Sequence, residues 1–162
     1  MLILKSILIV VAVVVVAVLA VGQAGLLKGK PPSQLGVRDG RLRPPAPTPN
    51  SVSSQAALYL EPGQRTYASI EPLPLQGSGP QTIAKLRAIV ESMPGAEVVK
   101  SNPDYLYAQY TTRLMKYVDD VEFWFDPAKK AIQVRSASRL GSRDFGVNRA
   151  RIDAIRLRLA AS

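Results

Sequence analysis

Residues 118–138 have the sequence VDDVEFWFDPAKKAIQVRSAS, and this stretch decides the fold. In a strand over 118–125, one face receives Val121, Phe123 and Phe125, because successive side chains point to opposite sides. The other face receives Asp120, Glu122 and Trp124, which we interpret as a solvated surface. A turn at 126–130 follows, and residues 131–138 return with Ile132 and Val134 facing inward. The stretch therefore predicts an antiparallel β-hairpin.

The residues before the hairpin predict further strands and one helix. Residues 104–112 are rich in Tyr and Thr, as strands are, and residues 96–100 predict a short strand before them. Ser78-Gly79-Pro80 opens a helix and Pro94-Gly95 ends it. The apolar side chains of this helix recur at helical spacing: Ile83, Leu86, Ile89, Val90 and Met93. Residues 65–75 predict one more strand, closed by Pro72 and Pro74.

After the hairpin, a helix is expected near 147–159, with Ile152, Ile155 and Leu159 on its buried stripe. This order of elements predicts an α+β fold. We expect an antiparallel sheet of about four to five strands with two helices packed on one face. An N-terminal transmembrane helix precedes it.

That N-terminal helix is predicted from the unbroken apolar run of residues 7–21, which Leu2, Ile3 and Leu4 extend toward the N-terminus. A bilayer core needs roughly 20 helical residues, and residues 2–21 meet this length if Lys5 reaches the headgroups. We favour an uncleaved anchor over a cleaved signal peptide. The basic residues in 28–43 favour a cytoplasmic C-terminal side, whereas the signal-like design favours export. We favour export, which gives a single-pass membrane protein with a periplasmic or extracytoplasmic domain.

Residues 28–57 contain six prolines between Pro31 and Pro49 and predict an extended, partly polyproline-like tether. The predicted organisation is thus an anchor or signal-like segment over 1–27, a Pro-rich linker over 28–57 and an α+β domain over 58–162.

Composition excludes several chemistries. The chain has no Cys and no His, so thiolate nucleophiles, zinc–thiolate sites and His-dependent catalysis are all absent. We expect no metal site and no cofactor. The 21 Lys and Arg residues exceed the 12 Asp and Glu residues, for a net charge of +9. Such a balance suits an acidic partner, anionic lipid or nucleic acid.

Two blocks of the sequence, one with LGVRDGRL and PTPNSVSSQA and one with VRSASRLGSRDFGVNRARIDAIR, resemble the family named domain of unknown function 1499. The first block has matching positions at Gly36, Asn50, Ser53 and Ser54. The second block is the more specific one. The resemblance covers about residues 35–158 and implies a domain rather than an activity. Members often carry Cys near the Pro-Asn pair; here Pro45 and Ser51 stand in such places, so no thiol-based role can operate.

The second block holds the candidate binding site, where the last strand leads into the last helix. Its polar members are Arg135, Ser136, Ser138, Arg139, Asp144, Asn148, Arg149 and Arg151. Arg side chains and a helix N-terminus both attract anions, so an anion pocket is one interpretation. The structural alternative is that Asp144 caps the helix, Gly141 and Gly146 permit the turn, and the arginines pair with acids or solvent.

Three function hypotheses follow. The leading one is a non-catalytic, membrane-tethered envelope module that binds an anionic ligand, a lipid surface or a protein partner; Arg149, Arg151, Arg156 and Arg158 could place the last helix on anionic lipid. A second is a hydrolase-like enzyme that uses Asp144, Ser53 or Ser54 with Arg support. A third is a structural subunit of a membrane complex. We do not expect nucleic-acid binding, because no RNP-type motif accompanies the tyrosines.

Overall fold

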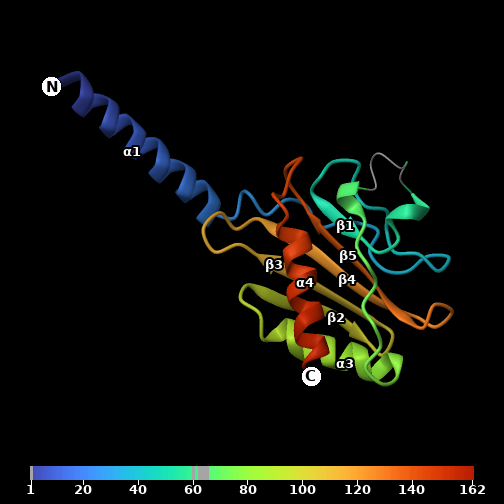
Figure 1. Ribbon diagram of the computed structural model, residues 1–162. Helices are drawn as coiled ribbons and strands as arrows, with labels where there is room; N and C mark the ends of the chain where they lie inside the picture. The colour runs from blue at the N-terminus through green and yellow to red at the C-terminus, as the bar shows by residue number, and fades with distance from the viewer. Residues whose placement is uncertain (1, 60, 62–65) are drawn as a thin grey trace.

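The computed structural model describes residues 2–59, 61 and 66–162. Along the chain, the helices are α1 (Leu2–Gln23), α3 (Gly79–Glu91) and α4 (Val147–Ala160), and a short 3-10 turn spans Ala56–Leu58. The strands are β1 (Ser51–Ser53), β2 (Ala96–Asn102), β3 (Tyr105–Thr111), β4 (Val118–Asp126) and β5 (Ala131–Ser138). Figure 1 shows α1 projecting from a domain built around one sheet.

The five strands form one antiparallel sheet in the order β1-β5-β4-β3-β2. The predicted hairpin is β4 and β5, whose register places Glu122 opposite Arg135 and Phe123 opposite Val134. The predicted α+β class is therefore confirmed.

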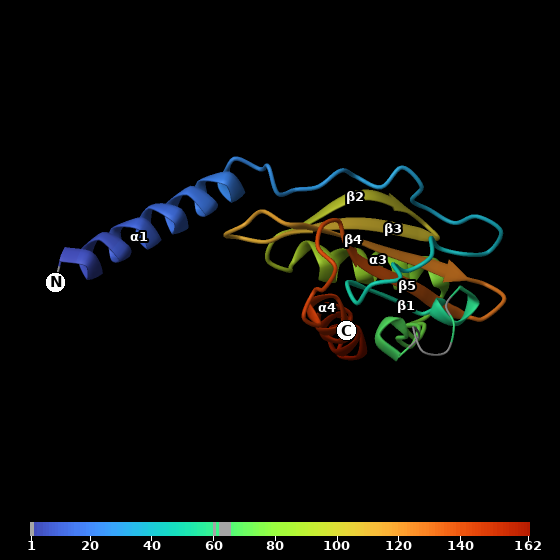
Figure 2. The same cartoon turned by 90° about the horizontal axis from the view of Figure 1, so that it is seen from above.

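Helices α3 and α4 both cover one face of the sheet, as Figure 2 shows. We call this the helix face. Helix α3 begins with a capping box: the Ser78 hydroxyl accepts from the Gln81 N–H while the Gln81 side chain accepts from the Ser78 N–H. The core between helices and sheet is apolar, and its completely buried side chains include Leu86, Leu106, Val121, Phe123, Ile132, Ile152 and Ile155.

The opposite face of the sheet, here called the second face, is covered by the N-terminal segment between α1 and β1. Figure 2 shows this segment crossing the sheet on the side away from α3 and α4. Leu42 packs with Tyr105 and Tyr107 in a small buried cluster, and Leu35, Val37 and Trp124 lie against it. Residues 38–41 form the turn between the outward and returning parts, closed by backbone hydrogen bonds between Arg38 and Arg41. The Pro-rich segment expected to be an extended tether is thus packed along the sheet, and its last residues form β1.

The strand expected over residues 65–75 is wrong in its described part, 66–75. This stretch makes isolated bridges instead, Ser53 with Ser69 and Leu73 with Ile132. Pro72 and Pro74 lack the N–H groups that a continuous ladder needs, so pairing cannot extend past Leu73. Residue 65 lies outside the described residues.

Helix α1 is long and apolar enough to cross a membrane: its span Ile3–Gln23 has a hydropathy of 3.1, and an 18-residue stretch within it contains no buried residue. This is a candidate single-pass span near the N-terminus. Its last residues contact the domain, because the Gln23 side-chain amide donates to the carbonyl oxygens of Arg113 and Leu114, at 3.2 and 2.7 Å.

Candidate anion-binding site

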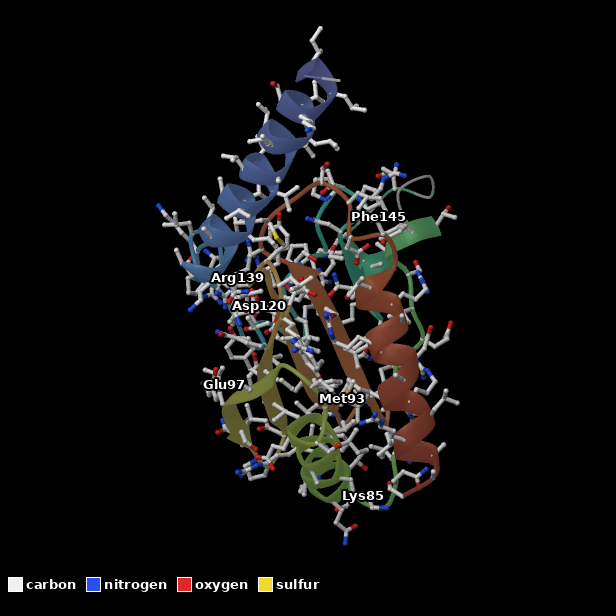
Figure 3. The ribbon with its side chains drawn as sticks, turned by 90° about the vertical axis from the view of Figure 1, so that its left-hand side faces the viewer. Lys85, Met93, Glu97, Asp120, Arg139 and Phe145 are labelled. Carbon is white, nitrogen blue, oxygen red and sulfur yellow. The ribbon has the colours of Figure 1, made fainter. Side chains whose placement is uncertain are left out.

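A buried ion pair lies on the second face at the ends of β4 and β5. The Arg139 guanidinium donates twice to Asp120, with Nη2 2.7 Å from Oδ1 and Nε 2.9 Å from Oδ2. The two side chains are 5% and 2% exposed, and Figure 3 shows them side by side. The interpretation of Asp120 and Glu122 as a solvated surface is therefore wrong. The Pro-rich segment covers this face, and both carboxylates are buried beneath it.

A second acid–base pair, Glu122 with Arg135, lies next to the first on the same face. Glu122 Oε1 accepts two hydrogen bonds of 2.8 Å, from the Gly36 N–H and from the Tyr105 hydroxyl. Glu122 Oε2 lies 3.7 Å from Arg135 Nη1, which is too far for a hydrogen bond. Among the described residues, neither Oε2 nor Nη1 has a hydrogen-bond partner, although both atoms are buried. A buried charge that lacks a partner is costly, so this guanidinium nitrogen has an open position for an acceptor.

The electrostatics of the second face follow from this burial. Burial lowers the pKa of the Arg135 guanidinium; Glu122 opposes this change and Arg43 adds to it. The pKa of Arg139 is raised, first by its hydrogen bond to Asp120. Burial, followed by the Glu122 carboxylate, raises the pKa of Tyr105, and burial followed by the hydrogen bond to Asp120 raises that of Tyr107. Both hydroxyls therefore stay protonated and donate to the carboxylates.

A cavity of about 550 Å³ lies above these pairs, between the outward and returning parts of the N-terminal segment. Arg135 and Arg139 line it from the sheet, whereas Lys30 and Arg43 line it from the segment and are exposed. Asp120 is the one acidic residue in this lining, and Arg139 already neutralises it. Asn50 and Ser138 add polar groups. The cavity lining therefore has an excess of positive charge and includes Arg135, the residue with the unpaired Nη1.

The other predicted site residues have their side-chain contacts on the helix face, although Ser138 also belongs to the cavity lining. Arg151 Nη2 contacts Asp119 Oδ2 at 2.5 Å, and Arg151 Nη1 donates to Ser136 and Asn148. The Asn148 side-chain amide donates in turn to Ser138, Asp144 and the Asn50 carbonyl. Asp144 accepts from the N–H groups of Gly146 and Asn148 and so satisfies one N–H of the first turn of α4, whose N-cap residue is Gly146 rather than Asp144. It also accepts from the Tyr67 hydroxyl.

The remaining arginines of α4 donate to groups of the protein itself. Arg149 donates to the carbonyls of Tyr67 and Ser69, and Arg156 donates to those of Glu71 and Pro72. Arg158 donates to the Ser92 hydroxyl. These side chains fasten residues 67–72 and the end of α3 to α4. The predicted polar block is thus divided between the two faces of the sheet. Arg135 and Arg139 line the cavity on the second face, whereas Ser136 and the α4 residues Asn148, Arg149 and Arg151 lie on the helix face.

The four marked residues of the first block have local structural contacts. Gly36 adopts a φ of 99°, which glycine tolerates, and presents its N–H to Glu122. The Asn50 side chain donates to the Gly141 carbonyl. The Ser53 hydroxyl accepts from the Gln55 N–H, and the Ser54 hydroxyl donates to Gln133.

These contacts bear on the hydrolase alternative, which needs Ser53 or Ser54 in one cleft with Arg139 and Asp144. The cavity that Arg139 lines includes neither serine and does not include Asp144. The described residues also contain no group of three or more acidic side chains arranged to hold a metal ion. The arrangement provides charge and hydrogen-bond donors rather than a nucleophile with a base.

Sequence reasoning missed four residues of this site: Lys30, Arg43, Asp120 and Glu122. The signal for the acidic pair was available, because Glu122 and Arg135 lie opposite each other once the hairpin register is set. Opposite charges across β4 and β5, beside Trp124 on β4 and Tyr105 on the neighbouring strand β3, indicate a covered face. Lys30 and Arg43 gave no such signal, because their positions depend on the path of the Pro-rich segment.

Comparison with known families agrees with the resemblance in the two sequence blocks. The model of a family described as "Protein of unknown function (DUF1499)" matches residues 41–159, and the chain belongs to this family. The matched range contains β1, the sheet, α3 and most of α4, whereas Gly36 and Lys30 precede it. No curated protein and no solved structure matches the chain.

Proposed function

We propose that this protein is a membrane-anchored envelope module that binds an anionic group in the cavity between the N-terminal segment and the ends of β4 and β5. The observation that carries the proposal concerns Arg135: this residue lines the cavity, and its buried Nη1 has no hydrogen-bond partner among the described residues. A phosphate or carboxylate oxygen would supply the missing acceptor. The proposed role is binding without bond making or breaking.

The chemistry of the cavity favours a compact anion with several oxygen atoms. Arg135 offers an open donor from below, and Lys30 and Arg43 offer charge from the rim. The guanidinium groups suit planar or tetrahedral oxyanions, because their donors form a fixed fork. A lipid headgroup and a free phosphate share this chemistry, and the choice between them is a matter for binding measurements.

The test uses the full chain in detergent micelles, titrated calorimetrically with inorganic phosphate, citrate and a short-chain phosphatidylglycerol. Arg43→Ala removes an exposed cavity cation, and Lys129→Ala, in the exposed turn between β4 and β5, is the matched control. We expect Arg43→Ala to weaken binding about tenfold, as loss of a charge-assisted contact does, and Lys129→Ala to bind as wild type. Binding by none of the three probes, or equal binding by both variants, would overturn the proposal.

A second variant tests the role of Arg135 without removing it. Glu122→Gln keeps an oxygen for Gly36 and Tyr105 but removes the carboxylate that competes for the guanidinium. We expect this variant to bind the anion more tightly than wild type. Weaker binding by a variant that melts like wild type would contradict the assignment of Arg135 as the central donor.

The side of the membrane is proposed separately, from the signal-like design of residues 1–27. Paired periplasm-active and cytoplasm-active reporters fused after Ser162 test it. Activity of the periplasmic reporter alone is expected. Activity of the cytoplasmic reporter alone would instead agree with the basic flank over 28–43 and would make cytoplasmic phosphate compounds the first ligands to screen.

A further inference from the structure

Two loops at one end of the domain carry exposed apolar side chains. One is the β3–β4 loop, residues 112–117, in which Leu114 is 63% exposed; the other is the β5–α4 loop, residues 139–146, in which Phe145 is 89% exposed. Figures 1 and 3 place both at the end of the domain from which α1 leaves. Large apolar side chains gathered at one end indicate a contact surface.

The β3–β4 loop lies at the level where α1 ends. The Gln23 side chain donates to the carbonyls of Arg113 and Leu114, and Gly22 is buried against Met115. A Cβ atom at Gly22 would lie 3.0 Å from the Met115 Cα, so the close contact suits a glycine. If α1 crosses a bilayer, its last residues lie near the headgroups, and this loop lies there with them.

The β5–α4 loop holds Phe145 outward in a fixed conformation. Phe145 has a φ of 54°, a left-handed value that is uncommon for a bulky residue. Its neighbours fix this geometry: the Asp144 N–H donates to the Pro49 carbonyl, and Asp144 accepts from the Gly146 N–H. The chain therefore presents a large apolar side chain to the outside at a conformational cost.

Basic side chains surround these apolar ones. Arg113 and Lys116 flank Leu114, Arg143 precedes Phe145, and Lys28 follows the end of α1. A largely apolar cavity of about 810 Å³ opens beside the two loops, with Arg113, Lys116 and Val147 in its lining. Apolar side chains ringed by cations match the interface of an anionic bilayer, whose headgroups are negative and whose acyl boundary is apolar.

We propose that these two loops insert into the interface of the bilayer that α1 crosses, with Leu114 and Phe145 at the acyl boundary. The proposal rests on the proposed anchor but not on the anion cavity. The domain is then seated on the membrane at three places: α1, the β3–β4 loop and the β5–α4 loop.

The absence of Cys makes single-cysteine labelling direct. The full chain is reconstituted in vesicles of phosphatidylcholine and phosphatidylglycerol, with a fluorescent probe at Leu114→Cys or Phe145→Cys. Leu157→Cys is the matched control, since Leu157 is exposed near the opposite end of α4. Lipids that carry a nitroxide on the acyl chain should quench the probes at 114 and 145 several-fold more than the probe at 157. A probe at Val14→Cys, within α1, reports whether the anchor is in the bilayer.

The outcomes separate the two proposals. Quenching at 14, 114 and 145 but not at 157 supports insertion. Quenching at 14 alone shows that the anchor spans the bilayer and overturns insertion of the loops. Absence of quenching at every position would overturn the anchor and insertion together, and would leave the calorimetric test of the cavity unaffected.

Discussion

The two faces of the sheet differ in what covers them. Two helices with apolar stripes close the helix face, and their side chains fill the space down to Phe123. A Pro-rich segment without regular structure covers the second face, where Tyr105 and Tyr107 lie with two buried acid–base pairs and a cavity. An irregular cover packs less completely than a helix, so it leaves both the room and the unpaired donor that a ligand site needs.

The largest expected effect distinguishes the acid–base pairs of the two faces. Asp120→Asn leaves Arg139 buried with the Tyr107 hydroxyl as its other partner, so we expect a loss of about 3–5 kcal/mol in the free energy of unfolding. Asp119→Asn should cost less, because Arg151 keeps Ser136, Asn148 and the ring of Tyr110. Urea unfolding monitored by circular dichroism measures both.

The double variant Asp120→Asn with Arg139→Met is the control for this comparison. Removing both charges should recover most of the lost free energy, since no charge is then left buried alone. Equal costs for Asp119→Asn and Asp120→Asn would show that the two faces hold their charges alike.

A smaller effect concerns the tyrosines. Burial raises the pKa of Tyr110, on the helix face, to about 12, although Arg151 and Arg158 oppose this change. Tyr105, on the second face, is raised further, because the Glu122 carboxylate adds to burial. The pKa of Tyr110 is higher in the folded than in the unfolded state. Its protonated hydroxyl therefore contributes fully to the free energy of unfolding below about pH 10, and this contribution is lost as the pH rises through about 12. For Tyr110 the loss is about 2–3 kcal/mol.

Unfolding measured between about pH 9 and about pH 12, with tyrosinate absorbance recorded in parallel, checks this prediction. Tyr110→Phe and Tyr105→Phe should each make the decline above about pH 10 less steep, because both tyrosines have the same unfolded pKa. The contribution of Tyr110 ends near pH 12, whereas that of Tyr105 continues above it. A Tyr110→Phe variant that loses stability with the same pH profile as wild type would contradict the assignment.

The smallest effect tests how the N-terminal segment is held. Gly36→Ala places a Cβ in open space, since no atom lies within 4 Å, so its cost comes from the φ of 99°. We expect about 1 kcal/mol from that strain, together with weaker anion binding as the N–H moves off Glu122. Gly146→Ala, at a position with a φ of 85° and no atom within 4 Å of an added Cβ, is the control outside the segment. The control should lose a similar free energy of unfolding in urea while binding the anion as wild type does. If both variants lost anion binding, the loss at Gly36 could not be assigned to its contact with Glu122.

Periodicity predicted the helix face well. The apolar stripes of α3 and α4 and the alternation in β3, β4 and β5 arise because each element packs against another regular element. Ile83, Phe123 and Ile152 could therefore be placed in the core from their spacing alone. The strand expected at 65–75 was wrong in its described part, 66–75, because this part makes only isolated bridges at Ser69 and Leu73, and Leu73 lies between two prolines.

The second face could not be predicted in the same way. A Pro-rich stretch has no period to read, and the alternation of Asp120 and Glu122 with Val121 is the same whether water or protein lies above them. The candidate site was therefore predicted in part: Arg135 and Arg139 were named from the second block, and the hairpin register pairs Glu122 with Arg135. The burial of the acidic residues and the positions of Lys30 and Arg43 follow from the path of residues 30–47.

That path also limits how far the domain can travel. Fully extended, the residues between α1 and β1 could reach roughly 90 Å, enough to carry a domain well away from its membrane. Here they are held along the sheet through Gly36, Leu42 and the turn at 38–41, and Gln23 is fastened to the β3–β4 loop. The length of the segment between α1 and β1 is therefore taken up by its path along the sheet. If α1 crosses a bilayer, the domain is therefore held next to that bilayer.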